Sequence, residues 1–169
     1  MSEITVRRAT LDDAAAIADI YTQGIMERIA TFESEPRTED DIRQKLESDS
    51  ERHPTLVAEL DGEVVGWASI SLYRPRQCYA GIGEFSFYID RNARGKGIGQ
   101  TLLKALIDEA ERLGYWKLLS RVFTFNHASL HACKKQGFRE VGTYEKHAKL
   151  DDEWLDVVII ERMIPSNLT

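Results

Sequence analysis

The 169-residue sequence predicts an α/β (α+β) sandwich, in which helices cover both faces of a mixed β-sheet. Segments of strand type alternate with segments whose apolar residues recur at helical spacing, in the order βααβββαβαββ. Two turn motifs, Asp61-Gly62 and Asp151-Asp152, each separate two strand segments and predict hairpins. The length is typical of one domain, so residues 1–169 are expected to form a single domain.

The first half of the chain contains two predicted helices and three predicted strands. A strand is expected from Ile4 to Ala9, followed by a helix that Thr10 caps. Thr38, with Asp41 three residues later, predicts the start of a second helix that ends near Asp49. The clearest hairpin follows, because Asp-Gly supplies the positive φ angles of a tight turn. Its strands are 55–60 and 63–72.

The second half adds four strands and two helices. A strand from Glu84 to Ile89 precedes a helix from about Gly97 to Leu113, and Gly114 is a suitable end for that helix. A buried strand is expected next, then a short helix that begins at Asn126 and ends before Gly137. The remaining predicted strands are 117–123, 140–149 and 154–163.

Composition excludes several classes of protein. Apolar residues make up 43% and charged residues 30%, as in soluble globular proteins, and the apolar runs are too short to span a membrane. The N-terminus lacks the features of a signal peptide, so a cytoplasmic location is expected. A net charge of −6 argues against nucleic-acid binding. Cys78 and Cys133 have no metal-ligand spacing to any histidine, so neither a metal site nor a disulfide is expected.

The stretch from Glu84 to Gly99 predicts a binding site for a phosphorylated ligand. A strand runs into a glycine-bearing loop and then into a long helix, whose first backbone N–H groups have no partner within the helix. Gly97 and Gly99 would let a diphosphate approach the backbone, and Arg94 with Lys96 would add positive charge. The alternative is an ordinary helix start with exposed basic residues.

The same stretch resembles the cofactor signature of the GNAT superfamily of acetyl-CoA-dependent N-acetyltransferases. That signature is Arg/Gln-x-x-Gly-x-Gly after a central strand, and Arg94, Gly97 and Gly99 match it. Asn126, followed by Gly137-Phe138, is a second match at the usual separation. The resemblance covers nearly the whole chain and implies a mixed, mostly antiparallel sheet flanked by helices on both faces.

Within the superfamily the chain resembles the phosphinothricin acetyltransferases and their methionine sulfone relatives. Four short segments support this narrower similarity. They are Phe32 before Glu35-Pro36, the 57–63 hairpin turn, Arg76 with Tyr79 ahead of Glu84, and the sequence 153–157 near the end of the chain. The resemblance implies an acetyl group transferred from acetyl-CoA to the primary amine of a small acidic amino acid or analogue, and a homodimer.

Several roles follow from the resemblance. The backbone of Phe87, Tyr88 and Ile89 would meet the pantetheine arm as an added strand would. Backbone N–H groups from Gly95 to Gln100 would hold the diphosphate, and Asn126 would bond the arm near the thiol. As alternatives, the three strand residues are simply core residues and Asn126 caps its helix. The expected cofactor-binding residues are Phe87, Tyr88, Ile89, Arg94, Gly95, Lys96, Gly97, Ile98, Gly99, Gln100 and Asn126.

Glu84 resembles the catalytic carboxylate of these enzymes and is the expected general base for the attacking amine. An ordinary glutamate titrates near ~4.3, so burial would have to raise the pKa or a water would have to relay the proton. Arg76 and Tyr79 are the expected contacts for an anionic acceptor, with Phe32 as a pocket wall. Exposed loop residues and core packing are the respective alternatives.

One position departs from the family pattern. Seven residues after Asn126, many of these enzymes carry a tyrosine or histidine that protonates the leaving thiolate, and this chain has Cys133. The thiol is either a proton donor or a buried structural residue. Two other functions stay open: acetylation of polyamines, aminoglycosides or protein amines, and a non-catalytic acetyl-CoA-binding module.

Overall fold

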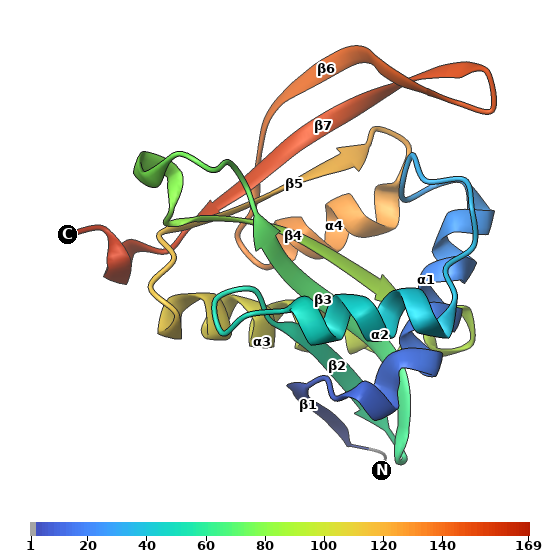
Figure 1. The fold of residues 1–169 in the computed structure, drawn as a ribbon. Coiled ribbons are helices and arrows are strands. Elements are labelled where there is room, and N and C mark those ends of the chain that lie inside the picture. The colour runs from blue at the N-terminus through green and yellow to red at the C-terminus, as the bar shows by residue number, and fades with distance from the viewer. Residues whose placement is uncertain (1–2) are drawn as a thin grey trace.

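The computed structural model describes residues 3–169, in which seven strands form one mixed sheet in the order β1-β2-β3-β4-β5-β7-β6. Helices cover both faces of the sheet (Figure 1). The strands are β1 (Ile4–Arg8), β2 (Thr55–Leu60), β3 (Glu63–Leu72), β4 (Ile82–Ile89), β5 (Lys117–Phe123), β6 (Arg139–Leu150) and β7 (Glu153–Met163). The main helices are α1 (Ala14–Glu27), α2 (Glu39–Ser48), α3 (Ile98–Arg112) and α4 (His127–Lys135). The predicted fold class and element order are confirmed.

The two central strands, β4 and β5, are the one parallel pair among the described strands. Their register is short and ends where Glu84 faces Leu119. Beyond this point the strands diverge, and Figure 1 shows the ends of β4 and β5 pointing apart. The backbone edges of both strands are therefore free of a β partner where they separate, and an extended ligand can take that place.

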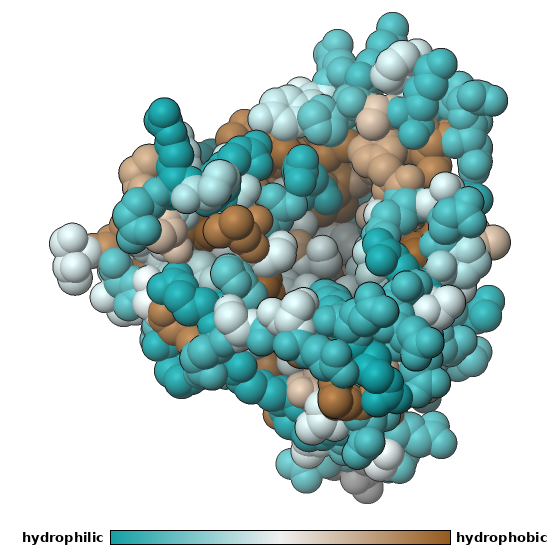
Figure 2. All heavy atoms as spheres, viewed as in Figure 1, coloured by the Kyte–Doolittle hydropathy of each residue, from teal (hydrophilic) through white to brown (hydrophobic). Residues whose placement is uncertain are grey.

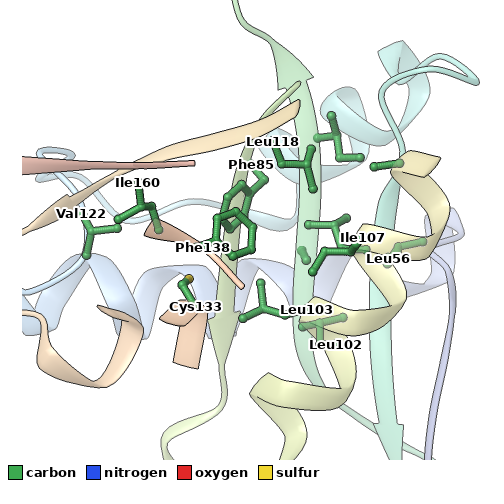
Figure 3. Close-up of a cluster of buried hydrophobic side chains, with 14 of the residues drawn as sticks. Leu56, Phe85, Leu102, Leu103, Ile107, Leu118, Val122, Cys133, Phe138 and Ile160 are labelled. Carbon is green, nitrogen blue, oxygen red and sulfur yellow. The ribbon is translucent and has the colours of Figure 1, made fainter. Parts of the chain in front are cut away.

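The main core lies between the sheet and the α3–α4 layer. The apolar residues of α3 recur at helical spacing and are buried against strands on this face, as Figure 3 shows for Leu102 and Leu103. Gly114, at φ +90°, follows the end of the helix in the left-handed conformation that the sequence predicts. The position of α3 is thus fixed by apolar packing, which in turn fixes its N-terminus beside the end of β4.

A second core lies on the opposite face, under α1 and α2. Ile17 and Ile20 of α1 and Ile42 of α2 are buried there against Val57 and Trp67 of the sheet. Thr38 and Asp41 form the predicted capping box at the start of α2. No helix within residues 3–169 combines the length and apolar character that a membrane span requires.

The start of β4 differs from the sequence-based expectation. The strand was expected to begin at Glu84, but it begins at Ile82, which pairs with Lys117. Gly83 allows this close pairing, because a Cβ at Gly83 would lie 2.7 Å from Cγ2 of Ile70. Glu84 is consequently an interior residue of the strand, and its backbone is held on both sides.

Candidate functional site

A cavity of about 420 Å³ lies between the end of β4, α1 and the starts of α3 and α4. It contains nearly all the residues that the sequence predicted to bind the cofactor. Lys96 is an exposed residue and is not part of the wall. The predicted residues that line the cavity are Phe87, Tyr88, Ile89, Arg94, Gly95, Gly97, Ile98, Gly99, Gln100 and Asn126.

The loop before α3 has the geometry of an anion cradle. Gly95 and Gly97 have φ angles of +79° and +80°, which disfavour residues with a Cβ. Gly97 is the N-cap of α3 and provides no side chain to satisfy the first N–H groups of the helix. No heavy atom lies within 4 Å of where a Cβ would stand at either glycine, so the backbone faces open space. The loop therefore fits a diphosphate bound by main-chain N–H groups.

Arg94 is less available to a phosphate than the sequence suggested. Its guanidinium donates to both carboxylate oxygens of Glu27, at 2.6 and 2.9 Å, and holds the pKa of Glu27 below its usual value. This bidentate pair connects the end of α1 to the loop before α3. Arg94 thus fixes the cavity wall, and its positive charge is largely matched by Glu27.

The start of α4 forms the wall facing α3. Asn126 caps α4, because its Oδ1 accepts a hydrogen bond from the backbone N–H of Ser129 at 3.3 Å. Asn126 also lines the cavity, so its role as a cap is compatible with the predicted contact to the cofactor arm. Gln100 of α3 donates to the carbonyl of Ala132 at 3.1 Å and joins the two helices. His131 lines the same cavity, a position that the sequence analysis did not assign.

A second cavity, of about 390 Å³, lies on the face of the sheet that α1 covers, between the α1–α2 loop, β4, β5 and the β6–β7 hairpin. Figure 2 shows this face of the molecule hollowed between the hairpin above and α2 below. A narrower space of about 50 Å³ lies where β4 and β5 separate. Ala30 and Tyr88 line all three spaces. The first cavity, beside the loop before α3 (the cofactor-side cavity), and the second cavity therefore share wall residues at the point where the strands diverge.

Glu84 lines the second cavity, and its contacts leave one carboxylate oxygen available. Its Oε2 accepts a hydrogen bond from Nη2 of Arg121 at 2.8 Å. Within residues 3–169, Oε1 receives no hydrogen bond. Strand alternation places Glu84, Ser86 and Tyr88 on the same face of the sheet. The predicted general base thus shares a face and a cavity wall with the point where the strands separate.

A second carboxylate, Glu33, lines the same cavity but is fully engaged. Arg37 donates to its Oε1, and the Tyr21 hydroxyl donates to its Oε2. Burial, together with this hydrogen bond, raises the pKa of Tyr21 well above its ordinary value. Tyr21 therefore stays a neutral phenol at neutral pH. With both oxygens bonded, Glu33 is a poorer proton acceptor than Glu84.

Tyr88 is clamped between helix and sheet. Its ring stacks on Trp67 at 5.1 Å and on Tyr21 at 5.0 Å between centroids. On the α1 side, a Cβ at Gly24 would lie 2.7 Å from the ring. Gly24, which weakens the last turns of α1 by propensity alone, is thus required for close packing on Tyr88. Burial raises the pKa of the Tyr88 phenol, which also stays neutral.

The predicted acceptor contacts divide into two groups. Phe32 lines the second cavity and packs edge-on against Phe123 at 4.8 Å, so it is both a pocket wall and a packed residue. Arg76 and Tyr79 lie in the exposed loop before β4, and neither is among the described residues that line that cavity. Tyr79 instead packs edge-on against Tyr73 at 5.8 Å. Their contact with an acceptor stays a prediction.

Cys133 lies in the main core, and it also lines the narrow space where β4 and β5 separate, but neither of the two larger cavities. Its side chain is 1% exposed and lies beside Phe138 and Val122, as Figure 3 shows. Burial raises the pKa of the thiol to about 12. An ordinary thiol has a pKa of ~8.5, so the Cys133 thiol is a weaker acid than the thiol that forms when the thiolate leaves. Proton transfer from Cys133 to that thiolate is therefore unfavourable. The geometry supports the buried structural alternative.

Two polar residues of the second cavity, Arg121 and His147, were missed from the sequence. Arg121 is a charged residue within the mostly apolar stretch 118–123 of β5, and that contrast was a usable sign. His147 follows Lys146, whose φ of +48° lies in a bulge of β6. Nothing in the sequence indicates this irregularity, because it depends on how β6 pairs with β7.

Comparisons with known proteins identify the family and several relatives of this chain. The sequence model of the acetyltransferase (GNAT) family matches residues 19–138. The phosphinothricin N-acetyltransferase of Alcaligenes faecalis is 34% identical over 160 residues, which cover 94% of this chain and 81% of that protein. The L-methionine sulfoximine/L-methionine sulfone acetyltransferase of Salmonella typhimurium is 29% identical over 161 residues, 94% of this chain and 93% of the relative.

Among solved structures, the phosphinothricin acetyltransferase of Sinorhizobium meliloti in complex with acetyl-CoA aligns with a TM-score of 0.89. It is 28% identical, and the alignment covers 95% of this chain and 88% of that one. The matched family region includes the end of β4, the glycine loop and α4. The chain therefore belongs to the acetyltransferase (GNAT) family.

Proposed function

We propose that this protein is an acetyl-CoA-dependent N-acetyltransferase that acts on the primary amine of a small acidic amino acid or analogue. One observation carries the proposal. The cavity beside the glycine loop and the cavity that contains Glu84 share the wall residues Ala30 and Tyr88, which also line the space where β4 and β5 separate. Two substrates that enter from opposite sides would have their reacting groups brought together there. The named activities of the two curated relatives support the substrate class.

The chain has the groups needed to hold acetyl-CoA, which supplies the acetyl group as a reactive thioester. Backbone N–H groups from Gly95 to Gln100 would bind the diphosphate at the N-terminus of α3. The free edge of β4 from Phe87 to Ile89 would bond the amide-containing arm as a neighbouring strand does. Asn126 stands at the far side of the same cavity. Most of these contacts come from the backbone, so the binding depends on chain geometry more than on side-chain identity.

Glu84 is the proposed general base. A protonated amine cannot attack a thioester, so a proton must first be removed. Oε1 of Glu84 is available for this step, directly or through a water, while Arg121 holds Oε2. The engaged Glu33 serves as part of the pocket wall. The leaving thiolate needs no donor from Cys133, because a thiolate is already an adequate leaving group.

Substitution of Glu84 by Gln tests the assignment. The variant keeps a hydrogen-bond acceptor for Arg121 and removes the base, so kcat should fall by about 10²- to 10⁴-fold. The dissociation constant of acetyl-CoA, measured by calorimetry, should stay within a factor of about two of the parent value, since Glu84 does not line that cavity. Turnover at the parent rate in Glu84→Gln would refute the role of Glu84.

Glu161→Gln provides a matched control. Glu161 is also a partly buried carboxylate paired with a guanidinium, that of Arg139 at 2.6 Å, but it lies outside both cavities. Its replacement should leave kcat unchanged. If the parent consumes no acetyl-CoA with phosphinothricin or methionine sulfone, the substrate class is wrong. A homodimer and a cytoplasmic location stay predictions from the sequence.

A further inference from the structure

The cavity that contains Glu84 already holds a cationic group suited to an acidic acceptor, and that group is not Arg76. We propose that Arg121 binds the carboxylate of an α-amino acid acceptor, with His147 as a second donor in the wall of the same cavity. This inference rests on the proposed function. It names the substrate class as α-amino acids, whose amine and carboxylate are carried by one carbon, and not polyamines.

The position of Arg121 follows from strand alternation. Leu119, Arg121 and Phe123 share one face of β5, and Leu119 is the residue that faces Glu84 across the parallel pair. Arg121 therefore lies just past the point where β4 and β5 separate, on the face that carries Glu84. Phe123 forms an apolar wall beside it. The side chain of Arg121 is 44% exposed and can be reached from the cavity.

Most of the hydrogen-bonding capacity of Arg121 is unused. A guanidinium has five N–H donors, and among the described residues Arg121 donates only to Glu84. A pair this exposed contributes little to stability, so stability does not explain a charged residue in this strand. The remaining donors form a planar fork, which matches the two oxygens of a carboxylate.

The pairing of Arg121 with Glu84 explains why the acceptor should be an α-amino acid. The two side chains are 2.8 Å apart and carry opposite charges. An α-amino acid carries its ammonium and its carboxylate on the same carbon, so its two charges are also a few ångströms apart. A carboxylate on Arg121 therefore places the amine beside Glu84, where its proton is to be removed. A polyamine offers no group to Arg121 and would bring a second positive charge next to it.

His147 reaches the cavity because of the bulge in β6. The register of β6 against β7 shifts between Tyr144 and Ala148, and the backbone N–H of Lys146 donates to Oδ1 of Asp156 at 2.7 Å. Bulges change the direction of a side chain, and here His147 lines the cavity while its ring stacks on Tyr144 at 4.9 Å. The imidazole adds a hydrogen-bond donor to the wall of the cavity that Arg121 also lines.

The test compares two acceptors that differ in charge. L-methionine sulfone carries the α-carboxylate, and its carboxamide keeps the shape without the charge. In Arg121→Gln, the KM of L-methionine sulfone should rise about 10- to 100-fold relative to the parent, because a charge-assisted bond is lost. The KM of the carboxamide should change by less than about 3-fold. Arg121→Lys should raise the KM of L-methionine sulfone by an intermediate amount, since it keeps the charge and loses the fork.

Controls separate recognition from folding. Arg139→Gln removes another guanidinium that pairs with a glutamate, on β6 and outside the cavity, and should leave both KM values at the parent level. Acetyl-CoA affinity should be the same in all variants. His147→Gln should raise the KM of L-methionine sulfone selectively, but less than Arg121→Gln does. If the ratio of the KM of L-methionine sulfone to the KM of its carboxamide stays at the parent value, His147 is removed from the proposal.

Equal changes of KM for both acceptors in Arg121→Gln, or no change, would overturn the role of Arg121. Binding provides an independent measurement: L-methionine sulfone is titrated calorimetrically into the complex of the protein with coenzyme A. A parent that binds but does not turn over would refute the proposed function, and the loss of binding in Arg121→Gln would still support the present inference. A parent that does not bind L-methionine sulfone would overturn it.

Discussion

Gly97 offers a test in which backbone strain and ligand binding can be separated, because Gly62 has almost the same conformation in a remote turn. The φ angles are +80° at Gly97 and +82° at Gly62, and neither position has a heavy atom within 4 Å of a would-be Cβ. Substitution by Ala therefore imposes the same left-handed strain at both sites. Only Gly97 lines the cofactor-side cavity.

The expected magnitudes follow from this comparison. An alanine in the left-handed region costs about 1–2 kcal/mol, and the less flexible unfolded chain returns roughly 0.4–1 kcal/mol. Each variant should thus lose about 1 kcal/mol of stability, which lowers Tm by about 2–4 °C in a chain of this length. In Gly97→Ala the added methyl group also stands in the anion cradle. The loss of one charge-assisted N–H contact should weaken acetyl-CoA binding about 10- to 100-fold.

Thermal unfolding and calorimetric titration with acetyl-CoA measure the two effects on the same samples. Gly62→Ala should show the lower Tm with the parent dissociation constant, and Gly97→Ala should show both changes. Equal dissociation constants in the two variants would refute the assignment of the diphosphate to this loop. If Gly62→Ala also bound acetyl-CoA more weakly, backbone strain at a remote turn would by itself lower the affinity. The weaker binding of Gly97→Ala could then not be assigned to a lost contact with the diphosphate.

Three further outcomes can be measured without knowing the acceptor. One thiol per native chain, that of the exposed Cys78, should react with Ellman's reagent, and Cys133 should react only after unfolding. Rapid reaction of two thiols in the native protein would contradict the buried position of Cys133. Since burial raises the pKa of Cys133 to about 12, its contribution to stability is present below the unfolded pKa near 9 and is lost as pH rises toward 12. Denaturant titrations should show a loss of at most about 1.4 kcal/mol from pH 9 to 10 that is absent in Cys133→Ala. Gly24→Ala should lower Tm although alanine favours helices, because its Cβ would overlap the Tyr88 ring; a higher Tm would mean that the ring moves freely.

The cofactor half of the site was accessible from the sequence because it is local. A strand, a glycine loop and the start of a helix follow one another within residues 84–99, and backbone groups are proposed to make most of the contacts with the cofactor. The order of helices and strands was likewise predictable from apolar periodicity and turn residues. The predicted cap at Asn126 is confirmed, and the same residue lines the cavity, while its contact with a cofactor stays a prediction.

The second cavity, which is proposed to bind the acceptor, could not be deduced in the same way, because the residues that line it are distant in sequence. Glu33, Glu84, Arg121 and His147 belong to four separate segments and meet only when the sheet forms. Which carboxylate keeps a free oxygen depends on tertiary neighbours: Arg37 and Tyr21 bind Glu33, while Glu84 has one side-chain partner, Arg121, among residues 3–169.

The amino-acid sequence by itself determined the elements, their order and the glycine loop that we propose binds the diphosphate, since short-range periodicity and backbone freedom specify each of them. Only the tertiary structure decided that β4 and β5 separate after Glu84, that Arg121 lies next to Glu84, and that the β6 bulge turns His147 into the cavity. These features come from pairing and packing between distant segments, which no local pattern records.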